Sequence, residues 1–382
     1  MKPGESACLE RLGIDAGRLK RAEAVLLGAI EADILPGCAV AMEVKGETVW
    51  REGYGRLEPE LPHKVVPETV YDLASLTKPL ACASSVMHLV ERGEVCLTDE
   101  LSSFFPERPL PHLKGVTLLH LLTHTSGLLW WDRFYEKADS PAGVVEAVLS
   151  APPEARPGER YAYSDLGYIL LGEIVRRITG KRLDDFAREA VFRPLGMETA
   201  GYFALDGGGR RFMGVQPVSS GEAEGRIAPT RFCPMREGRT LRGEVHDANG
   251  CALAGVSGHA GLFGSADDVM NYLRMLLNGG RGPDETPFLS PASVRLSTTS
   301  RIDPKVGGHS CGWFTPPNGL HSGGDVWADR GFSHTGFTGT AAFADPESGV
   351  ALCLLTNAVY FSTGEHNRVR RRFLNTLASS FV

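Results

Sequence analysis

The segment DLASLTKP, residues 72–79, places a lysine three positions after a serine. If a helix begins near residues 73–75, Ser75 and Lys78 lie one turn apart on one face, with the ammonium close to the hydroxyl. Pro79 agrees with that start, because proline is tolerated in a first helical turn but costs about 3 kcal/mol deeper in a helix. The pair could act as a nucleophile and its base, and the serine N–H at the positive helix end could bind an oxyanion.

Taken alone, the S-x-x-K pattern is a weak signal, because it arises often by chance at solvated helix starts. A lysine can serve as a base only if its pKa falls from about 10.4 toward neutrality, which requires desolvation or a nearby positive charge. Two further polar motifs follow along the chain, Tyr163-Ser164-Asp165 before an expected helix and His334-Thr335-Gly336 before an expected strand. A tyrosine near an ammonium is drawn toward phenolate, so we expect Lys78 and Tyr163 to titrate as a coupled pair.

The order and spacing of these three motifs resemble the serine β-lactamase and penicillin-binding-protein superfamily, in particular class C β-lactamases, DD-peptidases and family VIII carboxylesterases. In that superfamily S-x-x-K is followed by Y-x-N and then by K-T-G or H-x-G. The segments HLLTHTSGL and SGHAGLFGSADDV also look like its connecting segments, so the resemblance runs through most of the chain. It implies an α+β fold, in which an antiparallel sheet is flanked by helices and a helical domain is inserted.

The resemblance also implies roles for individual residues in an acyl-enzyme mechanism. Ser75 would be the nucleophile, Lys78 and Tyr163 would share the proton transfers, and the backbone N–H groups of Ser75 and Phe337 would form the oxyanion hole. An extended substrate amide could pair with the strand after Gly336, which leaves room for its approach. Substrate binding would then involve four residues: Asp165, His334, Thr335 and Gly336.

Two positions depart from the commonest motif of the superfamily. Asp165 stands where an asparagine is usual, which replaces an amide donor by a charged acceptor. His334 stands where β-lactamases usually have lysine, and an imidazole with a pKa near 6.5 is mostly neutral at pH 7. Both changes favour hydrolysis of an ester or amide over hydrolysis of a β-lactam, and they predict that His334 meets a substrate carboxylate only when it is protonated.

A rival nucleophile is Ser310, because residues 308–312, GHSCG, match the G-x-S-x-G elbow of α/β-hydrolases. An elbow needs a strand before it and a helix after it, whereas two prolines and three glycines occur in the segment WFTPPNGLHSGGD that follows. The sequence therefore favours a strand or loop segment at Ser310.

Other groups of residues allow weaker interpretations. His120 and His124 stand four apart, as metal ligands on a helix can, but no H-E-x-x-H is present, so a helix end near the rim of the site is favoured. A His/Asp group has no matched serine motif nearby and is interpreted as loop contacts: His246, Asp247 and His259. Trp130 and Trp131 either line a substrate cleft or cover the core, and both options stay open. No cofactor and no metal are predicted.

The elements expected around these motifs are strands at both ends of the chain and helices between them. A helix begins after Asp15, a hairpin covers residues 38–55, a second hairpin covers residues 339–357, and a helix covers residues 365–380. Residues from about 69 onward have a helical pattern for roughly two hundred positions. We therefore expect a discontinuous sheet domain of residues 1–70 and 300–382, a mainly helical domain of residues 71–299, and an active site at their junction.

Composition limits the possible partners. The 382 residues are 42% hydrophobic, and the net charge of −6 comes from 46 acidic and 40 basic residues that are mixed along the chain. This pattern predicts a globular protein that binds neither nucleic acid nor a membrane, and a small-molecule or short-peptide substrate. The one basic cluster is interpreted as the wet face of the last helix: Arg368, Arg370, Arg371 and Arg372.

Location and oligomeric state are less constrained. The eight cysteines are scattered without a C-x-x-C pair, and the N-terminal stretch has no apolar run of the length of a signal peptide. Buried free thiols and a cytoplasmic protein are therefore expected. The sequence leaves the oligomeric state open. It predicts a serine hydrolase acting on an ester or amide, with β-lactam and D-Ala-D-Ala-like substrates left open. The alternatives are a catalytically weak or inactive binding or scaffold protein on this fold and an α/β-hydrolase using Ser310.

Overall fold

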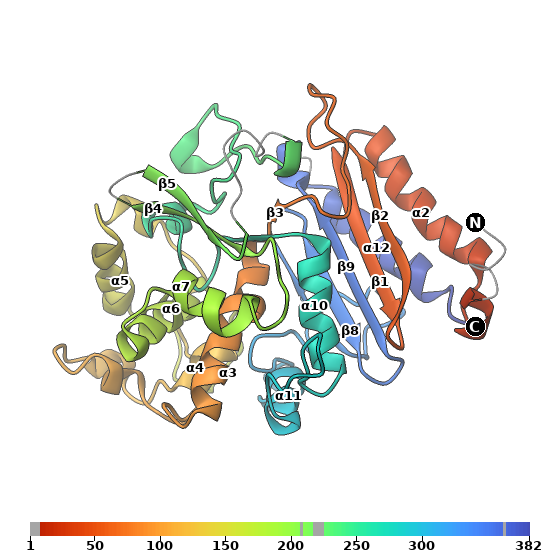
Figure 1. Ribbon diagram of the computed structural model, residues 1–382. Coiled ribbons are helices and arrows are strands. Elements are labelled where there is room, and N and C mark those ends of the chain that lie inside the picture. Colours follow the sequence, from red (N-terminus) through yellow and green to blue (C-terminus); the bar gives the residue numbers. More distant parts are fainter. Residues whose placement is uncertain (1–7, 207–208, 217–224, 362–363) are drawn as a thin grey trace.

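Strands from both ends of the chain pair into one five-stranded antiparallel sheet (Figure 1). The computed structural model describes residues 8–206, 209–216, 225–361 and 364–382, so the first seven residues of the N-terminal stretch lie outside it. The strands lie in the order β2 (Glu47–Gly55), β1 (Gly37–Val44), β9 (Val350–Thr356), β8 (Ala341–Asp345) and β7 (Phe332–Thr335). This pairing confirms the expectation that the first and last segments share one sheet.

Helices cover both faces of the five-stranded sheet (Figure 1). Helices α2 (Ala16–Glu31) and α12 (His366–Ala378) pack together on one face, where they bury Val40 and Met42 of β1. Helix α10 (Ala266–Leu277) packs on the other face, where β1 presents Ala39 and Ala41. Because side chains alternate along a strand, the larger residues of β1 face α2 and α12, and its small residues allow α10 to approach closely.

Local signals explain the ends of these elements. Asp15 caps α2 by accepting a hydrogen bond from the Arg18 N–H at 2.7 Å, as the sequence predicted. The β1–β2 turn has Lys45 and Gly46 both at positive φ, 53° and 81°, which is the pattern of a two-residue hairpin turn that follows the strand twist.

A second, four-stranded sheet lies within the segment that was expected to be helical. Its order is β3 (Tyr71–Asp72), β6 (Leu262–Gly264), β4 (Gly201–Asp206) and β5 (Gly209–Gly214). The expectation of a mainly helical segment did not include this sheet. Strands β3 and β6 are only two and three residues long, too short for a period-two pattern to be visible.

The remaining α-helices surround α3 (Ser84–Glu91) and α6 (Asp165–Thr179), whose apolar faces enter the larger of the two main cores. Residues 70 and 300 as domain boundaries stay a prediction, because α10 lies in the middle segment and yet packs on the five-stranded sheet. Further α-helices in the described part of the chain include α4 (Leu118–Leu122), α5 (Pro141–Ser150), α7 (Leu183–Ala187), α9 (Ala248–Ala252) and α11 (Pro291–Thr298).

All eight cysteines are free thiols, and five of them are buried: Cys38, Cys82, Cys233, Cys311 and Cys353. This agrees with the expectation of buried free thiols. Among the described residues, no helix combines the length and the hydropathy that crossing a membrane requires.

The close packing of α10 on β9 can be tested at Cys353, which is fully buried with its Sγ 3.7 Å from the Ala266 carbonyl oxygen. Cys353→Leu should lower the free energy of unfolding by about 1–3 kcal/mol, because the added volume overpacks this contact. Urea unfolding measures the change. Leu354→Met, on the opposite face of β9, conserves volume and is the matched control. An unchanged stability of the leucine variant would contradict the close approach of α10.

Candidate active site

Ser75 lies in a strained turn directly after β3. Ala74 has φ 48°, a left-handed conformation that costs a non-glycine residue free energy, and the Asp72 carboxylate holds it by accepting from the Ala74 N–H at 2.9 Å. Residues Ala74–Leu76 form a 3-10 turn, Lys78–Ala83 form a π-helical turn, and only then does α3 begin. The expected α-helical start is therefore corrected in detail. The expected proximity of serine and lysine is present.

The loop after β7 packs against this turn from the other side. The Thr338 and Thr340 hydroxyls donate to the carbonyl oxygens of Asp72 and Leu73, at 2.7 and 3.0 Å. A Cβ added to Gly336 would lie 2.6 Å from the Leu73 carbonyl oxygen. The glycine therefore makes room for the nucleophile turn. It also lines the groove beside Ser75, so its expected role in the approach of a substrate stays a prediction.

Lys78 is a buried cation whose ammonium is surrounded by acceptors. Its Nζ lies 3.0 Å from Ser75 Oγ, 3.0 Å from the His259 carbonyl oxygen and 2.7 Å from Asp165 Oδ1, and its side chain is fully buried. Burial lowers the pKa of Lys78, but the Asp165 carboxylate and the Tyr163 hydroxyl beside it outweigh this effect, so the pKa is raised above its usual value. The condition under which Lys78 could serve as the base, a pKa near neutrality, is therefore not met in the free protein.

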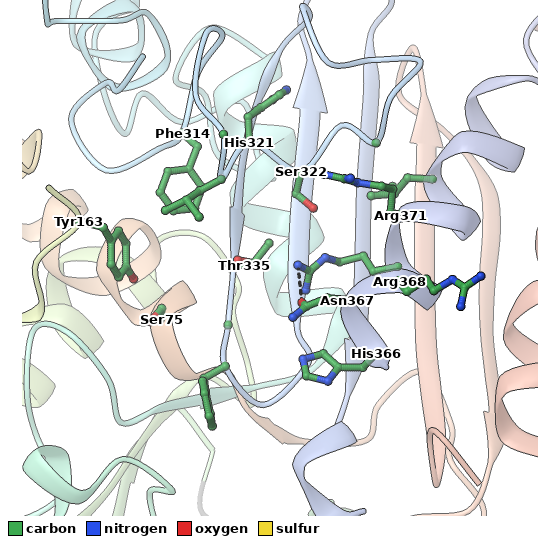
Figure 2. Close-up of a pocket in the computed structure, with 17 residues that line it drawn as sticks. Ser75, Tyr163, Phe314, His321, Ser322, Thr335, His366, Asn367, Arg368 and Arg371 are labelled. Carbon is green, nitrogen blue, oxygen red and sulfur yellow. Dashed lines mark hydrogen bonds between the residues drawn. The ribbon is translucent and has the colours of Figure 1, made fainter. Parts of the chain in front are cut away.

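Tyr163 points its hydroxyl toward Ser75 (Figure 2). Lys78 Nζ lies 4.9 Å from the centre of the tyrosine ring. Burial raises the pKa of Tyr163, the Lys78 ammonium lowers it and the Asp165 charge raises it again, and the net pKa lies above the usual value. At neutral pH the free protein therefore holds both a phenol and an ammonium beside the serine.

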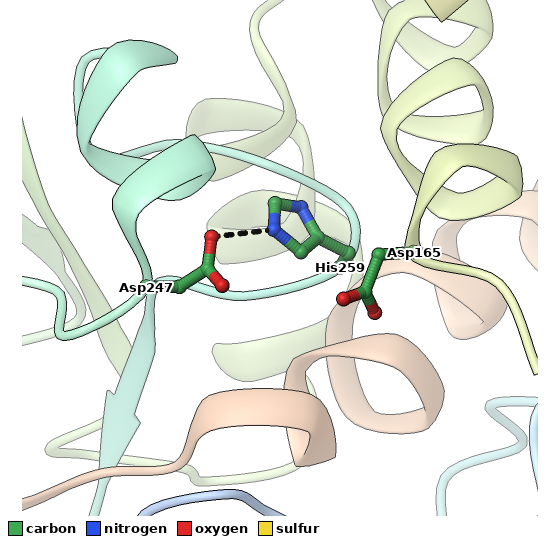
Figure 3. Close-up of side chains that lie close together, drawn as sticks. All are labelled: Asp165, Asp247 and His259. Atoms are coloured by element: carbon green, nitrogen blue, oxygen red, sulfur yellow. Dashed lines mark hydrogen bonds and ion pairs between the residues drawn. The ribbon is translucent and has the colours of Figure 1, made fainter. Parts of the chain in front are cut away.

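Asp165 is the first residue of α6, and the Ser164 hydroxyl caps that helix. A second carboxylate lies nearby: Asp247, the N-cap of α9, pairs with His259 Nε2 at 2.8 Å (Figure 3). Burial raises the pKa of Asp247, but the His259 charge and hydrogen bond lower it more, to about 2. The His259 ring is also bound to the Ser257 hydroxyl at 2.6 Å, so it holds in place the carbonyl that accepts from Lys78.

These three groups form the one set of potential metal ligands found in the described part of the chain. One atom from each lies within 4.8 Å of the others: Asp165, Asp247 and His259. Asp165 is already paired with Lys78, and Asp247 with His259. The sequence interpretation of the His/Asp group as loop contacts missed that it lies beside the nucleophile, because no local motif links residue 259 to residue 78.

His334 and Thr335 lie in the edge strand β7 itself, and not before a strand as expected. Ser333 exchanges two backbone hydrogen bonds with Phe314, both 2.9 Å, on the side away from β8. By alternation the Thr335 backbone groups point to that same side, where the edge is open toward the groove. An extended substrate can add to this edge.

His334 is fully buried and stacks on Phe314 with ring centres 4.3 Å apart. Burial, helped by the charges of Lys78 and His309, holds the pKa of His334 well below its usual value. A buried neutral imidazole contradicts the expectation that protonated His334 binds a substrate carboxylate. Two more buried histidines, His124 and His309, lie in the same layer with ring centres 4.8 Å apart.

The resemblance implies an oxyanion hole made of two backbone N–H groups, and in the described part of the chain both groups lack another hydrogen-bond partner. Among the described residues, neither the Ser75 N–H nor the Phe337 N–H donates to a protein acceptor. The Phe337 ring is 72% exposed and stacks on His246 with ring centres 5.7 Å apart. Phe337 therefore presents a backbone N–H without a protein partner in the described residues and an apolar ring on the wall of the groove, while its role in an oxyanion hole stays a prediction.

A groove of about 700 Å³ leads from Ser75 and Tyr163 past Thr335 to the start of α12 (Figure 2). Its far end is lined by a cationic group from that helix: Arg368, Arg370 and Arg371. Arg370 is bound to the Asn367 side chain at 2.9 Å, and no carboxylate in the described residues lies within 4.0 Å of it. Burial and the neighbouring Arg371 lower the pKa of Arg370 to about 10. The sequence interpretation of these arginines as the wet face of the last helix is confirmed, since the side chains of Arg368 and Arg371 are 77% and 65% exposed. The sequence did not indicate that this face shares a groove with the nucleophile.

The rival candidates are placed elsewhere. Ser310 is fully buried in a loop, where its hydroxyl donates to the Ser297 carbonyl oxygen at 2.5 Å. His120 completes the capping box of α4 with Thr117, and His124 Nδ1 accepts from the Ser164 N–H at 2.9 Å, which puts a helix end near the site as expected. Trp130 is 64% exposed beside Asp165, and its carbonyl accepts from the Asp165 N–H at 2.9 Å.

Comparisons with known proteins identify the family. The model of the family described as Beta-lactamase matches residues 27–375. The chain belongs to the beta-lactamase family. It is 30% identical over 365 residues to an N-acetylmuramyl-L-alanine amidase of Bacillus subtilis strain 168, covering 86% of this chain and 79% of that protein. It is 28% identical over 373 residues to a protein of Escherichia coli K12 provisionally named D-alanyl-D-alanine carboxypeptidase, covering 91% of this chain and 84% of that protein.

Solved structures show the same family fold. The octameric penicillin-binding-protein homologue from Pyrococcus abyssi matches with a TM-score of 0.70 at 22% identity, covering 95% of this chain and 79% of that one. EstCE1, a hydrolase with promiscuous acyltransferase activity, matches with a TM-score of 0.69 at 22% identity, covering 94% and 98%. The expected family and fold class are therefore confirmed: helices and antiparallel sheets in the β-lactamase and penicillin-binding-protein fold.

The buried histidine layer makes stability depend on pH. Burial lowers the pKa of His309 to about 4, while an unfolded chain has a histidine pKa of about 6.5. The unfolded state therefore binds the proton more tightly, so stability is full above about pH 6.5 and falls as the pH drops toward about 4. His309→Gln should reduce this slope by about 1.4 kcal/mol per pH unit. Chemical unfolding across this range measures it.

The matched control for this experiment is His112→Gln, at an exposed position, which should keep the wild-type slope. Equal slopes for wild type and His309→Gln would show that His309 is not held neutral by the fold.

Proposed function

We propose that this beta-lactamase-family hydrolase forms an acyl-enzyme on Ser75 and acts on small ester or amide substrates. The observation that carries the proposal is the junction itself, where an accessible serine in a strained turn lies 3.0 Å from the ammonium of Lys78 and beside the Tyr163 hydroxyl. Relatives named as an amidase and a carboxypeptidase, and a neighbour named as a hydrolase, support the reaction class.

In acylation, Ser75 Oγ attacks the carbonyl carbon of the substrate, and the Lys78/Tyr163 pair removes the hydroxyl proton. The negative charge that develops on the carbonyl oxygen is bound by the N–H groups of Ser75 and Phe337. The pair then returns the proton to the leaving oxygen or nitrogen as its bond to the carbonyl carbon breaks. Water takes the place of the leaving group in the second half of the reaction, which releases the acid and restores the Ser75 hydroxyl.

The groove supports a more specific substrate class, in which an anionic group lies on the side toward α12. Arg368, Arg370 and Arg371 line that end of the groove, and the guanidinium geometry suits carboxylates. A short peptide with a free carboxylate could pair with the edge of β7 through its backbone and with this cationic end through its carboxylate. In this proposal the arginines, and not His334, bind the charged group of the substrate.

The alternative of an inactive binding or scaffold protein on this fold has less support. The buried Lys78 ammonium and its ion pair with Asp165 are costly features for a protein that has no reaction to perform. The free thiols are in keeping with a cytoplasmic or other reducing location, which we retain as part of the proposal.

Labelling identifies the nucleophile. A fluorophosphonate probe or a penicillin should acylate Ser75 alone, and peptide mapping by mass spectrometry locates the adduct. Ser75→Ala should abolish labelling, while Ser310→Ala, which removes the rival serine, should be labelled like the wild type. An adduct on Ser310 would support the α/β-hydrolase alternative, and the absence of any adduct would favour a binding protein.

Charge recognition in the groove is tested at Arg370. Arg370→Gln should lower kcat/KM for a carboxylate-bearing ester by about tenfold relative to a neutral ester of the same acyl group, because a charge-assisted hydrogen bond is worth about 1.5–3 kcal/mol. Arg372→Gln is the matched control, since Arg372 is on the same helix but does not line the groove. Equal losses of kcat/KM for both esters, or an equal effect of Arg372→Gln, would contradict the binding of an anionic substrate group by Arg370.

A further inference from the structure

The ammonium of Lys78 is held by two hydrogen bonds and one ion pair. It donates to Ser75 Oγ and to the His259 carbonyl oxygen, both at 3.0 Å, and its Nζ lies 2.7 Å from Asp165 Oδ1. An ammonium has no lone pair with which to accept the proton of Ser75. Since Lys78 donates to Ser75 Oγ, the serine hydroxyl is free to direct its own proton toward Tyr163.

We propose that Asp165 is a positioning residue that keeps Lys78 permanently charged and thereby assigns the proton transfers to Tyr163. The proposal rests on the acyl-enzyme function above and specifies which member of the Lys78/Tyr163 pair loses its proton. It turns the departure at residue 165, aspartate in place of the usual asparagine, into a functional difference. An asparagine oxygen could lie at the same place beside the ammonium, but it could not neutralise the charge.

The surroundings of Lys78 favour this assignment. The charged form of the lysine is buried, and a buried cation persists only when a counter-charge lies next to it. Asp165 is that counter-charge, at 2.7 Å, and its side chain is only 14% exposed, so solvent screens the pair weakly. The raised pKa of Lys78 agrees with this geometry.

Other titratable groups face the lysine from every element packed around it, and each has a different partner or no charge. The Asp247 carboxylate is paired with His259 Nε2. The residue in contact with Lys78 is His259, whose backbone carbonyl accepts a hydrogen bond from the ammonium. The remaining groups are neutral thiols, phenols or imidazoles: Cys82, His124, Tyr168 and His334. Asp165 is therefore the carboxylate among the described residues that contacts the ammonium directly.

The resulting proton sequence balances. The rate rises with pH as the Tyr163 phenol loses its proton to solvent, while Lys78 is still an ammonium. This rising part of the pH profile, which reports the catalytic base, is called the basic limb below. The phenolate takes the proton of Ser75 as the Oγ–carbonyl bond forms, and the new phenol gives that proton to the leaving group as its bond breaks. In the second half, the phenolate takes a proton from water and passes it to Ser75 Oγ. Lys78 keeps its three protons throughout.

The principal test is the pH profile of kcat/KM with a neutral ester. Asp165→Asn keeps the acceptor but removes the charge, so the apparent pKa of the basic limb should move to lower pH by about 1–3 units, the effect of one close opposite charge. Asp165→Glu restores the charge and should return the limb toward the wild-type position. Asp247→Asn removes a carboxylate bound to His259 and should shift the limb by less than half as much.

A second measurement needs neither turnover nor a variant at residue 165. With ¹³Cζ-tyrosine and ¹⁵Nζ-lysine labels, assigned through Tyr163→Phe and Lys78→Arg, the Tyr163 signal should titrate in the wild type while the Lys78 signal keeps its ammonium shift. Titration of Lys78 before Tyr163 would overturn the proposal, as would an unmoved limb in a folded Asp165→Asn protein.

The two proposals fail separately. Absence of a Ser75 adduct in the wild type would refute the acyl-enzyme function, whereas the order of titration of Lys78 and Tyr163 would still be measured. A Ser75 adduct together with an unmoved limb would refute only the role of Asp165.

Discussion

The site depends on a single constraint, which is that one ammonium is buried where apolar helices meet two sheets. Lys78 has no exposed surface, so its charge must be met by protein groups. They come from distant segments: Asp165 at the start of α6, the His259 carbonyl before β6, and Ser75 in the turn after β3. Satisfying this one cation fixes the relative positions of three segments, and the nucleophile is one of them. The geometry needed for chemistry is thus also the geometry needed for a folded core.

A second set of contacts holds the nucleophile turn against the five-stranded sheet. Thr338 and Thr340 bind the carbonyl oxygens of Asp72 and Leu73, and Gly336 allows the two backbones to touch. Asp72 in turn accepts from the N–H groups of Ala74 and His246 at 2.9 and 2.7 Å. The strained φ of Ala74 is therefore maintained by hydrogen bonds from both sides, which fixes the turn that carries Ser75.

The residues that could be predicted from the sequence are those whose role follows from their spacing to near neighbours in the chain. Ser75 and Lys78 are three positions apart, the cap of α2 is Asp15, and the buried stripe of α12 follows a helical period. The residues that were missed act through contacts between distant parts of the chain. Asp247 reaches the site through His259, and His334 is buried because Phe314 pairs with the neighbouring Ser333 across the edge of β7. The β4–β5 hairpin did have a signal, aromatic residues followed by a glycine-rich turn, which the helical texture around it obscured.

Charge is arranged so that the two ends of the groove differ. Beside the serine, the positive charge of Lys78 is neutralised by Asp165 and serves the proton transfers. At the far end, the guanidinium of Arg370 has a neutral amide partner and keeps its full charge available to a ligand. Between them the buried imidazoles of His124, His309 and His334 hold their pKa values below the usual range, so they add no competing positive charge near Tyr163. The ion-paired ammonium of Lys78 attracts an anion only weakly, whereas the guanidinium of Arg370, which lines the open groove, has no carboxylate partner among the described residues. The chain therefore separates the two tasks in space.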